Sequence, residues 1–147
     1  MVCTFFGHKD TSSHITNELE MTVRELIKSG VREFFVGNNG NFDFYVQKIL
    51  SKLAEEEDIS FAVVLSYIDE CAIGTSQEYT LFPEGQEDAL PRFAIVKRNQ
   101  WIINKADVAV VYVKNHFSNA NKWAELAKKK KNQSDKHSKS VIMQRLI

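Results

Sequence analysis

The stretch Ile-Ser-Phe-Ala-Val-Val-Leu, residues 59–65, decides the fold of this 147-residue chain. It is almost continuously apolar and rich in β-branched residues, which is typical of a strand covered on both faces. Three further strands are predicted by Asp-Val-Ala-Val-Val-Tyr-Val at 107–113, Val-Cys-Thr-Phe-Phe at 2–6 and Val-Arg-Glu-Phe-Phe-Val at 31–36. Strands buried on both faces belong to parallel sheets, because the crossover helices cover both sides.

Helical patterns fill the intervals between these strands. Apolar residues recur at helical spacing over 15–27 and 42–53, and a helix is also favoured over 92–105. Strands that alternate with helices form βαβ units, so we predict an α/β fold. The expected architecture is a Rossmann-like three-layer α/β/α sandwich with a mostly parallel central sheet. Strand 2–6 should be central, because in this topology the chain winds outward in both directions.

The remaining segments are less regular. Residues 69–91 carry both prolines and two glycines, which predicts a long loop with at most a short helix. A helix is expected to begin at Ser118 or Asn119 and to run into the lysines at 128–131, and residues 141–143 fit a final edge strand. We expect a single domain over residues 1–147, with a polar, lysine-rich segment at about 128–140.

Composition restricts the classes of function. Hydrophobic residues make up 44% of the chain and charged residues 26%, as in globular domains. Lys+Arg and Asp+Glu both number 19, so the zero net charge gives no bulk attraction to nucleic acid or anionic lipid. Cysteines and histidines show no metal-ligand spacing, and no stretch has the length of a signal peptide or a membrane span. We therefore expect a cytoplasmic protein with no membrane partner, no metal and no cofactor.

Three loops follow predicted strands at the carboxyl edge of the sheet, where parallel α/β folds bind ligands. Glycine and asparagine allow successive backbone N–H groups to converge on an anion, and each loop precedes a helix N-terminus. A neighbouring helix adds an arginine, which suits bidentate contact with phosphate. The candidate ligand-binding residues are Gly7, His8 and Lys9 in the first loop; Gly37, Asn38, Asn39, Gly40 and Asp43 in the second; Ser118, Asn119 and Ala120 in the third; and Arg98 and Asn99 on the helix.

Each candidate also has an ordinary structural interpretation. Gly and Asn are common in βα turns, Asp43 can cap its helix, and Arg98 can be a surface residue. Neither the dinucleotide fingerprint nor a P-loop is present. Trp101 and Trp123 fit a core better than a stacking platform. Because βα loops of a parallel sheet share one edge, we nevertheless predict that the three loops and Arg98 line one cleft for a phosphate-bearing ligand.

The ordered set of motifs resembles the SLOG superfamily, the Rossmann-like domains related to the DNA-processing Smf/DprA proteins and the LOG phosphoribohydrolases. It is most similar to the small bacterial YpsA-like (DUF1273) branch. The resemblance rests on Phe6-Gly7-His8-Lys9, residues 36–43, residues 98–101, Ala106-Asp107, and Asn119-Ala120 with Lys122. Gly40, Phe42 and Asp43 match the group. Lys9 stands at an arginine position, Asn38 and Asn39 replace small residues, and residues 118–120 stand where Gly-Gly-Ala is usual.

The resemblance implies a site for a nucleotide or nucleotide derivative, and three hypotheses follow. The leading one is a non-catalytic binding or sensing domain for such a small molecule. The second is an enzyme that cleaves a nucleoside monophosphate, assisted by Asp43 or Glu78. The Pro-Gly-Gly-x-Gly-Thr-x-x-Glu motif of the LOG enzymes is not found, which speaks against it. The third, a DNA-associated module, is disfavoured by the zero net charge. The sequence leaves a homo-oligomer open.

Overall fold

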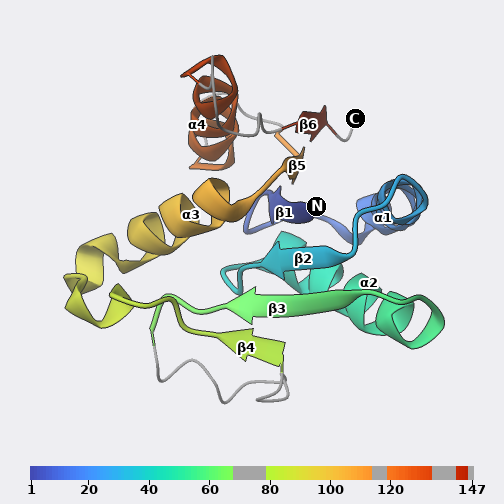
Figure 1. Ribbon diagram of the computed structural model, residues 1–147, viewed down its shortest axis with the longest axis horizontal. Helices are drawn as coiled ribbons and strands as arrows, with labels where there is room; N and C mark the ends of the chain where they lie inside the picture. Colours follow the sequence, from blue (N-terminus) through green and yellow to red (C-terminus); the bar gives the residue numbers. More distant parts are fainter. Residues whose placement is uncertain (68–78, 114–118, 134–141, 146–147) are drawn as a thin grey trace.

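A computed structural model describes residues 1–67, 79–113, 119–133 and 142–145, with the backbone alone for residues 119–120, 130–133 and 142–145. The described strands form one six-stranded sheet in the order β4-β3-β2-β1-β5-β6, which can be followed from bottom to top in Figure 1. The strands are β1 (Val2–Phe6), β2 (Glu33–Val36), β3 (Ser60–Val64), β4 (Thr80–Leu81), β5 (Val108–Val111) and β6 (Ile142–Arg145). The helices are α1 (Thr16–Lys28), α2 (Asn41–Glu56), α3 (Ala94–Lys105) and α4 (Asn119–Gln133).

The predicted α/β Rossmann-like fold is confirmed. Every pair of neighbouring strands among the described residues is parallel. Strand β1 is central, as expected, because it pairs with β2 on one side and β5 on the other. The chain first winds from β1 to β4 and then returns past β1 to β5 and β6. The strand order therefore reverses between β1 and β5, which is the position where open α/β sheets have a crevice.

The segment predicted as a long loop is partly ordered into short elements. Strand β4 pairs with the end of β3 through Val63 and Thr80, and one-turn 3₁₀ helices span Gln86–Asp88 and Pro91–Phe93. Two strand residues are too few to show an alternating pattern, so no pattern in the sequence predicts β4. Residues 69–78 of the predicted loop lie outside the described residues.

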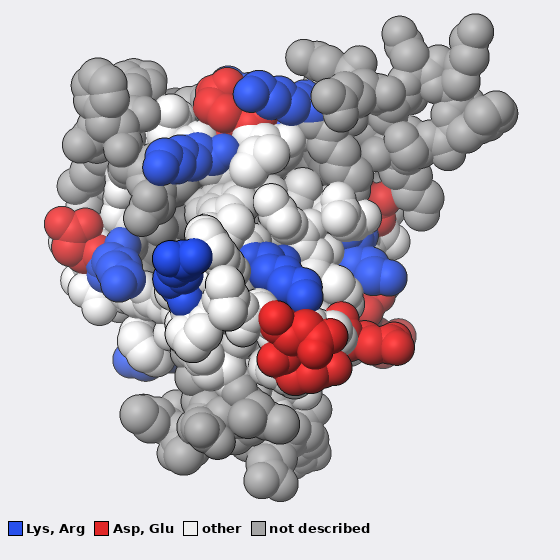
Figure 2. All heavy atoms as spheres, turned by 90° about the vertical axis from the view of Figure 1, so that its left-hand side faces the viewer, with Lys and Arg blue, Asp and Glu red and all other residues white. Residues whose placement is uncertain are grey.

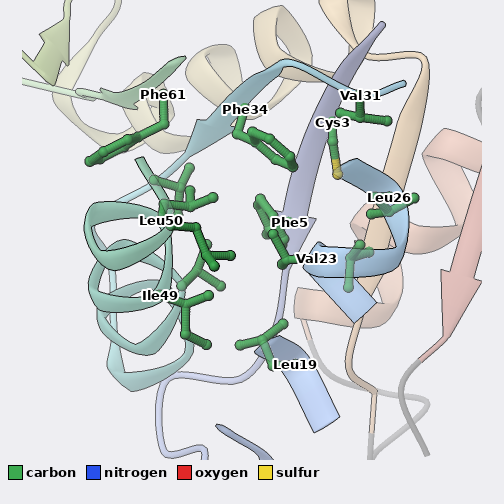
Figure 3. Close-up of a cluster of buried hydrophobic side chains, with 14 of the residues drawn as sticks. Cys3, Phe5, Leu19, Val23, Leu26, Val31, Phe34, Ile49, Leu50 and Phe61 are labelled. Atoms are coloured by element: carbon green, nitrogen blue, oxygen red, sulfur yellow. The ribbon is translucent and has the colours of Figure 1, made fainter. Parts of the chain in front are cut away.

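The larger hydrophobic core lies between the sheet and helices α1 and α2. Figure 3 shows Leu19 and Val23 of α1 and Leu50 of α2 pointing toward Phe5 and Phe34 of the sheet. These five side chains are at most 2% exposed. Cys3 lies in the same core as a free thiol, and burial raises the pKa of this thiol. Cys3 therefore packs as a small buried hydrophobic residue.

A second, smaller core lies between the opposite face of the sheet and helices α3 and α4. It contains Phe6 and Phe35 of the sheet, Ile102 of α3, and Ala124 and Ala127 of α4. Helices thus cover both faces, which explains why β3 and β5 read as continuous apolar runs. Across the described ranges, no helix has the length and apolarity needed to cross a lipid bilayer.

Candidate functional site

A pocket of about 660 Å³ lies at the carboxyl ends of β1 and β2, beside helices α3 and α4. It occupies the point where the strand order reverses, and its volume falls within the usual range for small-molecule sites. Figure 2 views the molecule from the side toward which the arrows of β2 and β3 point in Figure 1, and several Lys and Arg side chains lie on this face. The pocket has a polar wall from the β1 and β2 loops and an apolar wall from α3 and α4.

The β1 loop rests on the first turn of α2. A Cβ atom on Gly7 would overlap the ring of Phe42, so only glycine lets the chain pass this ring. Phe42 also stacks on Tyr112 at a centroid distance of 6.3 Å, and His8 meets Tyr112 edge-on at 5.8 Å. Gly7 is therefore a close-contact glycine that brings the β1 loop against the start of α2.

The β2 loop is joined to the β1 loop through Lys9. The backbone N–H of Asn41 donates to the Lys9 carbonyl at 2.8 Å. Gly40 has a φ of +153°, and a Cβ on it would lie 2.6 Å from the Lys9 Cα. This contact and this backbone conformation both exclude a side chain at position 40. The two loops thus form one surface. The backbone of Lys9 is held in place on this surface, and its side chain is exposed.

Asp43 in the first turn of α2 faces back toward the β2 loop. Its Oδ2 accepts a 2.9 Å hydrogen bond from the backbone N–H of Asn39. Asn39 precedes Gly40, the N-cap residue of α2, so this hydrogen bond closes the β2 loop and does not cap a backbone N–H of the helix, as the structural interpretation expected. Burial raises the pKa of Asp43, while the Asn39 hydrogen bond and the Arg98 charge act in the opposite direction. Asp43 also lines the pocket, so its hydrogen bond to the loop does not remove it from the site.

Arg98 of α3 is a buried residue, 3% exposed, and the interpretation as a surface residue is wrong. Its Nη1 donates to the Asn38 side chain at 3.3 Å and to the Val64 carbonyl at 3.4 Å, and its Nε donates to Asn99 Oδ1 at 3.0 Å. A Cβ on Gly37 would lie 3.1 Å from Nη1, so this glycine makes room for the guanidinium. Arg98 therefore ties the ends of β2 and β3 to α3, besides bordering the pocket.

The structure brings eight of the predicted residues together in this one pocket: Gly7, His8, Lys9, Gly37, Asn39, Asp43, Arg98 and Asn99. Two others, Asn38 and Gly40, are not among the lining residues but support Arg98 and Lys9. Asn119 and Ala120 form the start of α4, with only their backbone described. Ser118 lies outside the described residues, as does Glu78. That any of them binds a ligand stays a prediction.

Sequence reasoning missed the apolar wall of the pocket. This wall comes from α3 and α4, which also add two polar residues, Gln100 and Lys122. Trp123 is only partly buried: its ring stacks on Phe6 at 6.2 Å and also lines the pocket, so assigning it to the core alone was incomplete. Trp101 does pack on Phe35, at 5.5 Å. The sequence feature that came closest to indicating a contribution from α4 was Lys122, one of the residues on which the family resemblance rests. The apolar lining residues of the two helices are Ile95, Val96, Ile102, Trp123 and Leu126.

The pocket lining carries three cationic side chains, Lys9, Arg98 and Lys122, and two acidic ones, Asp10 and Asp43. Lys9 and Lys122 bring exposed ammonium groups, and Asn99 uses its amide oxygen for Arg98, which leaves its NH₂ group for the pocket. The buried Nδ2 of Asn39 has no hydrogen-bond partner within the described part of the chain. Cationic side chains outnumber acidic ones in this lining, which favours an anionic ligand. Among the described residues, no group of His, Cys, Asp and Glu side chains could hold a metal ion.

Comparisons with known proteins do not identify a relative. No protein-family model, no curated protein and no solved structure matches the chain.

Proposed function

We propose that this pocket binds a nucleotide or nucleotide derivative through its phosphate and does not convert it. The observation that carries the proposal is the pocket itself: Lys9, Lys122 and the Asn39 amide surround the carboxyl ends of β1 and β2. Open parallel sheets bind ligands at this position, and the N-terminus of α2 adds a positive dipole end beside it. In this proposal the protein is a cytoplasmic sensor or carrier of a small molecule.

Membership of the SLOG superfamily is part of the proposal. The contacts made by the motif residues support it, because these contacts require the residue types that match the motif. Gly7 passes the ring of Phe42, Gly40 passes the backbone of Lys9, and Asp43 accepts from Asn39. A motif made of residues that contact one another specifies one geometry of the two loops.

Isothermal titration calorimetry with AMP, UMP and ADP-ribose tests the proposed function. We expect at least one of them to bind the wild-type protein. Replacing both exposed lysines of the pocket, Lys9→Ala with Lys122→Ala, should weaken binding roughly 10- to 100-fold, because one charge-assisted hydrogen bond contributes about 1.5–3 kcal/mol. Circular dichroism should be unchanged, since both side chains are exposed.

The matched control is Lys28→Ala with Lys48→Ala, which removes the same charge from exposed positions on α1 and α2 outside the pocket. Equal weakening in both double variants would show that net charge, and not the pocket, attracts the ligand. If none of the three probes binds the wild-type protein, the proposed function is wrong.

One observation favours a second candidate, hydrolysis of the N-glycosidic bond of a nucleoside monophosphate. Asp43 is a pocket carboxyl whose pKa is raised by burial, as in many general acids and bases. Incubation with AMP and water would then release adenine and ribose 5-phosphate. Multiple turnover that is lost in Asp43→Asn would establish this activity and exclude binding alone.

A further inference from the structure

Two helices, α3 and α4, both contribute partly exposed hydrophobic side chains to the pocket lining. Ile95 and Val96 at the start of α3 are 37% and 39% exposed, and Leu126 of α4 is 39% exposed. All three line the pocket, although they are far apart in the sequence. Single exposed apolar residues are common, but a group of them around one cavity marks a ligand-binding surface.

Trp123 is the largest side chain of this apolar wall. One side of its indole is supported by Phe6, at 6.2 Å and an interplanar angle of 25°. Phe6 ends β1, directly before the Gly7–Lys9 loop, so the indole lies next to the polar wall as well. A planar ring held by a second ring at the boundary of a pocket is a stacking surface.

We propose that the ligand is a phosphate ester that carries an aromatic ring, such as a nucleobase, and that this ring lies against Trp123 between α3 and α4. This inference rests on the proposed function, because it places the phosphate at the polar wall. A sugar phosphate would leave the apolar residues of the pocket in contact with water. A nucleobase has two apolar faces to cover them and polar edges within reach of Asn99 and Gln100.

The shape of the apolar surface supports a small ring as its occupant. The exposed hydrophobic residues line a cavity of about 660 Å³, which also contains buried polar groups, among them Asn99 and Arg98. A flat protein partner would cover such residues without filling the cavity. A ring linked to a phosphate would contact both walls at once.

Calorimetry with AMP and ribose 5-phosphate, which share the sugar and the phosphate, tests the inference. We expect AMP to bind at least about 10-fold more tightly, since stacking of one base on an aromatic side chain has an effect of this order. Trp123→Leu should bring the two affinities close together by weakening AMP alone. Trp101→Leu is the matched control: Trp101 packs on Phe35 outside the pocket lining, so this variant should keep the preference for AMP.

A second measurement does not depend on the stability of Trp123→Leu. The chain has two tryptophans, so Trp123 is the sole indole emitter in Trp101→Phe. AMP should quench its fluorescence, and ribose 5-phosphate should not. Equal affinities for AMP and ribose 5-phosphate, or no quenching at saturating AMP, would overturn the inference and leave the proposed function standing. Failure of both compounds to bind would overturn the inference together with phosphate binding at this pocket.

Discussion

The α1/α2 face of the sheet and the α3/α4 face carry different kinds of side chain. On the first, large residues such as Phe34, Phe42 and Leu50 are completely buried. On the second, the buried residues include the small side chains of Ala109, Ala124 and Ala127, and larger apolar residues remain partly exposed around the pocket. Burial of apolar surface is the main source of stability, so the two faces should contribute unequally to it. We expect the α1/α2 face to contribute more of the stability, whereas the α3/α4 face leaves apolar side chains partly exposed around the pocket.

The largest expected difference in stability is between two Leu→Ala variants, one on each face of the sheet. Leu50→Ala removes a fully buried side chain from α2 and should lower the free energy of unfolding by about 3 kcal/mol. Leu126→Ala removes a partly exposed side chain from α4 and should cost less than about 1 kcal/mol. Urea unfolding followed by circular dichroism measures both. Similar losses in the two variants would remove the distinction between the faces.

Arg98 tests whether the polar wall belongs to the stable part of the molecule. Arg98→Ala should cost about 2–3 kcal/mol, because it leaves the Asn38 and Asn99 oxygens and the Val64 carbonyl without this donor. Arg92→Ala is the control, since this exposed guanidinium only lies over the Phe93 ring, and it should change stability by about 0.5 kcal/mol or less. If both variants unfold at the same urea concentration, the buried hydrogen bonds of Arg98 are not structural.

Substitutions at two glycines separate the cost of backbone strain from the cost of a tight contact. Gly30 has the strain alone, and Gly40 has both. Gly30 has a φ of +106° and no atom within 4 Å of an added Cβ, so Gly30→Ala should cost about 1 kcal/mol. Gly40 combines a φ of +153° with a Cβ position 2.6 Å from the Lys9 Cα, so Gly40→Ala should cost about 2 kcal/mol. Thermal and urea unfolding measure the difference. Equal costs would show that the β1 and β2 loops can separate easily.

The smallest effect concerns the protonation of Asp43. Burial raises the pKa of this carboxyl above its ordinary value, so the folded protein keeps the proton to a higher pH than the unfolded chain does. Its contribution to stability is therefore greatest at low pH and falls as the pH rises through the folded-state pKa. Asp43→Asn keeps an oxygen that can accept from Asn39 but does not titrate in this range.

Urea unfolding of the two proteins between pH 4 and pH 7 measures this contribution. The wild-type protein should gain stability relative to Asp43→Asn as the pH is lowered. A difference that does not change with pH, or that changes in the opposite sense, would contradict the raised pKa.

The sheet and the polar wall follow from the sequence for a simple reason. Strand and helix patterns differ in period, and the order of elements then sets a parallel sheet with β1 in the middle. Loops that follow parallel strands share one edge of the sheet, so the sequence alone predicts that Gly7 and Gly37 lie close together, as they do in the pocket. These inferences need only local patterns and chain connectivity.

The burial of Arg98 and the apolar wall could not be derived in this way. Whether a residue on α3 faces the sheet or the solvent depends on the rotation of the helix, and Arg98 is polar, so a surface position was the ordinary expectation. Ile95 and Leu126 are more than thirty residues apart in the sequence, and only tertiary packing places both in the lining of one pocket. A partly exposed Trp123 has the same sequence pattern as a buried one.

Strands β1 and β5 are neighbours in the sheet although they are far apart in the chain, since Cys3 pairs with Val108. During synthesis at roughly 5–20 residues per second, the edge of β1 that β5 covers stays unpaired for about 5–20 s after β1 has been made. An open edge that carries Phe5 and Phe6 can pair with other chains in that interval. The pocket also needs α4, which follows β5 in the chain. A ligand can therefore stabilise the completed domain by mass action, but it cannot protect the nascent chain during this interval.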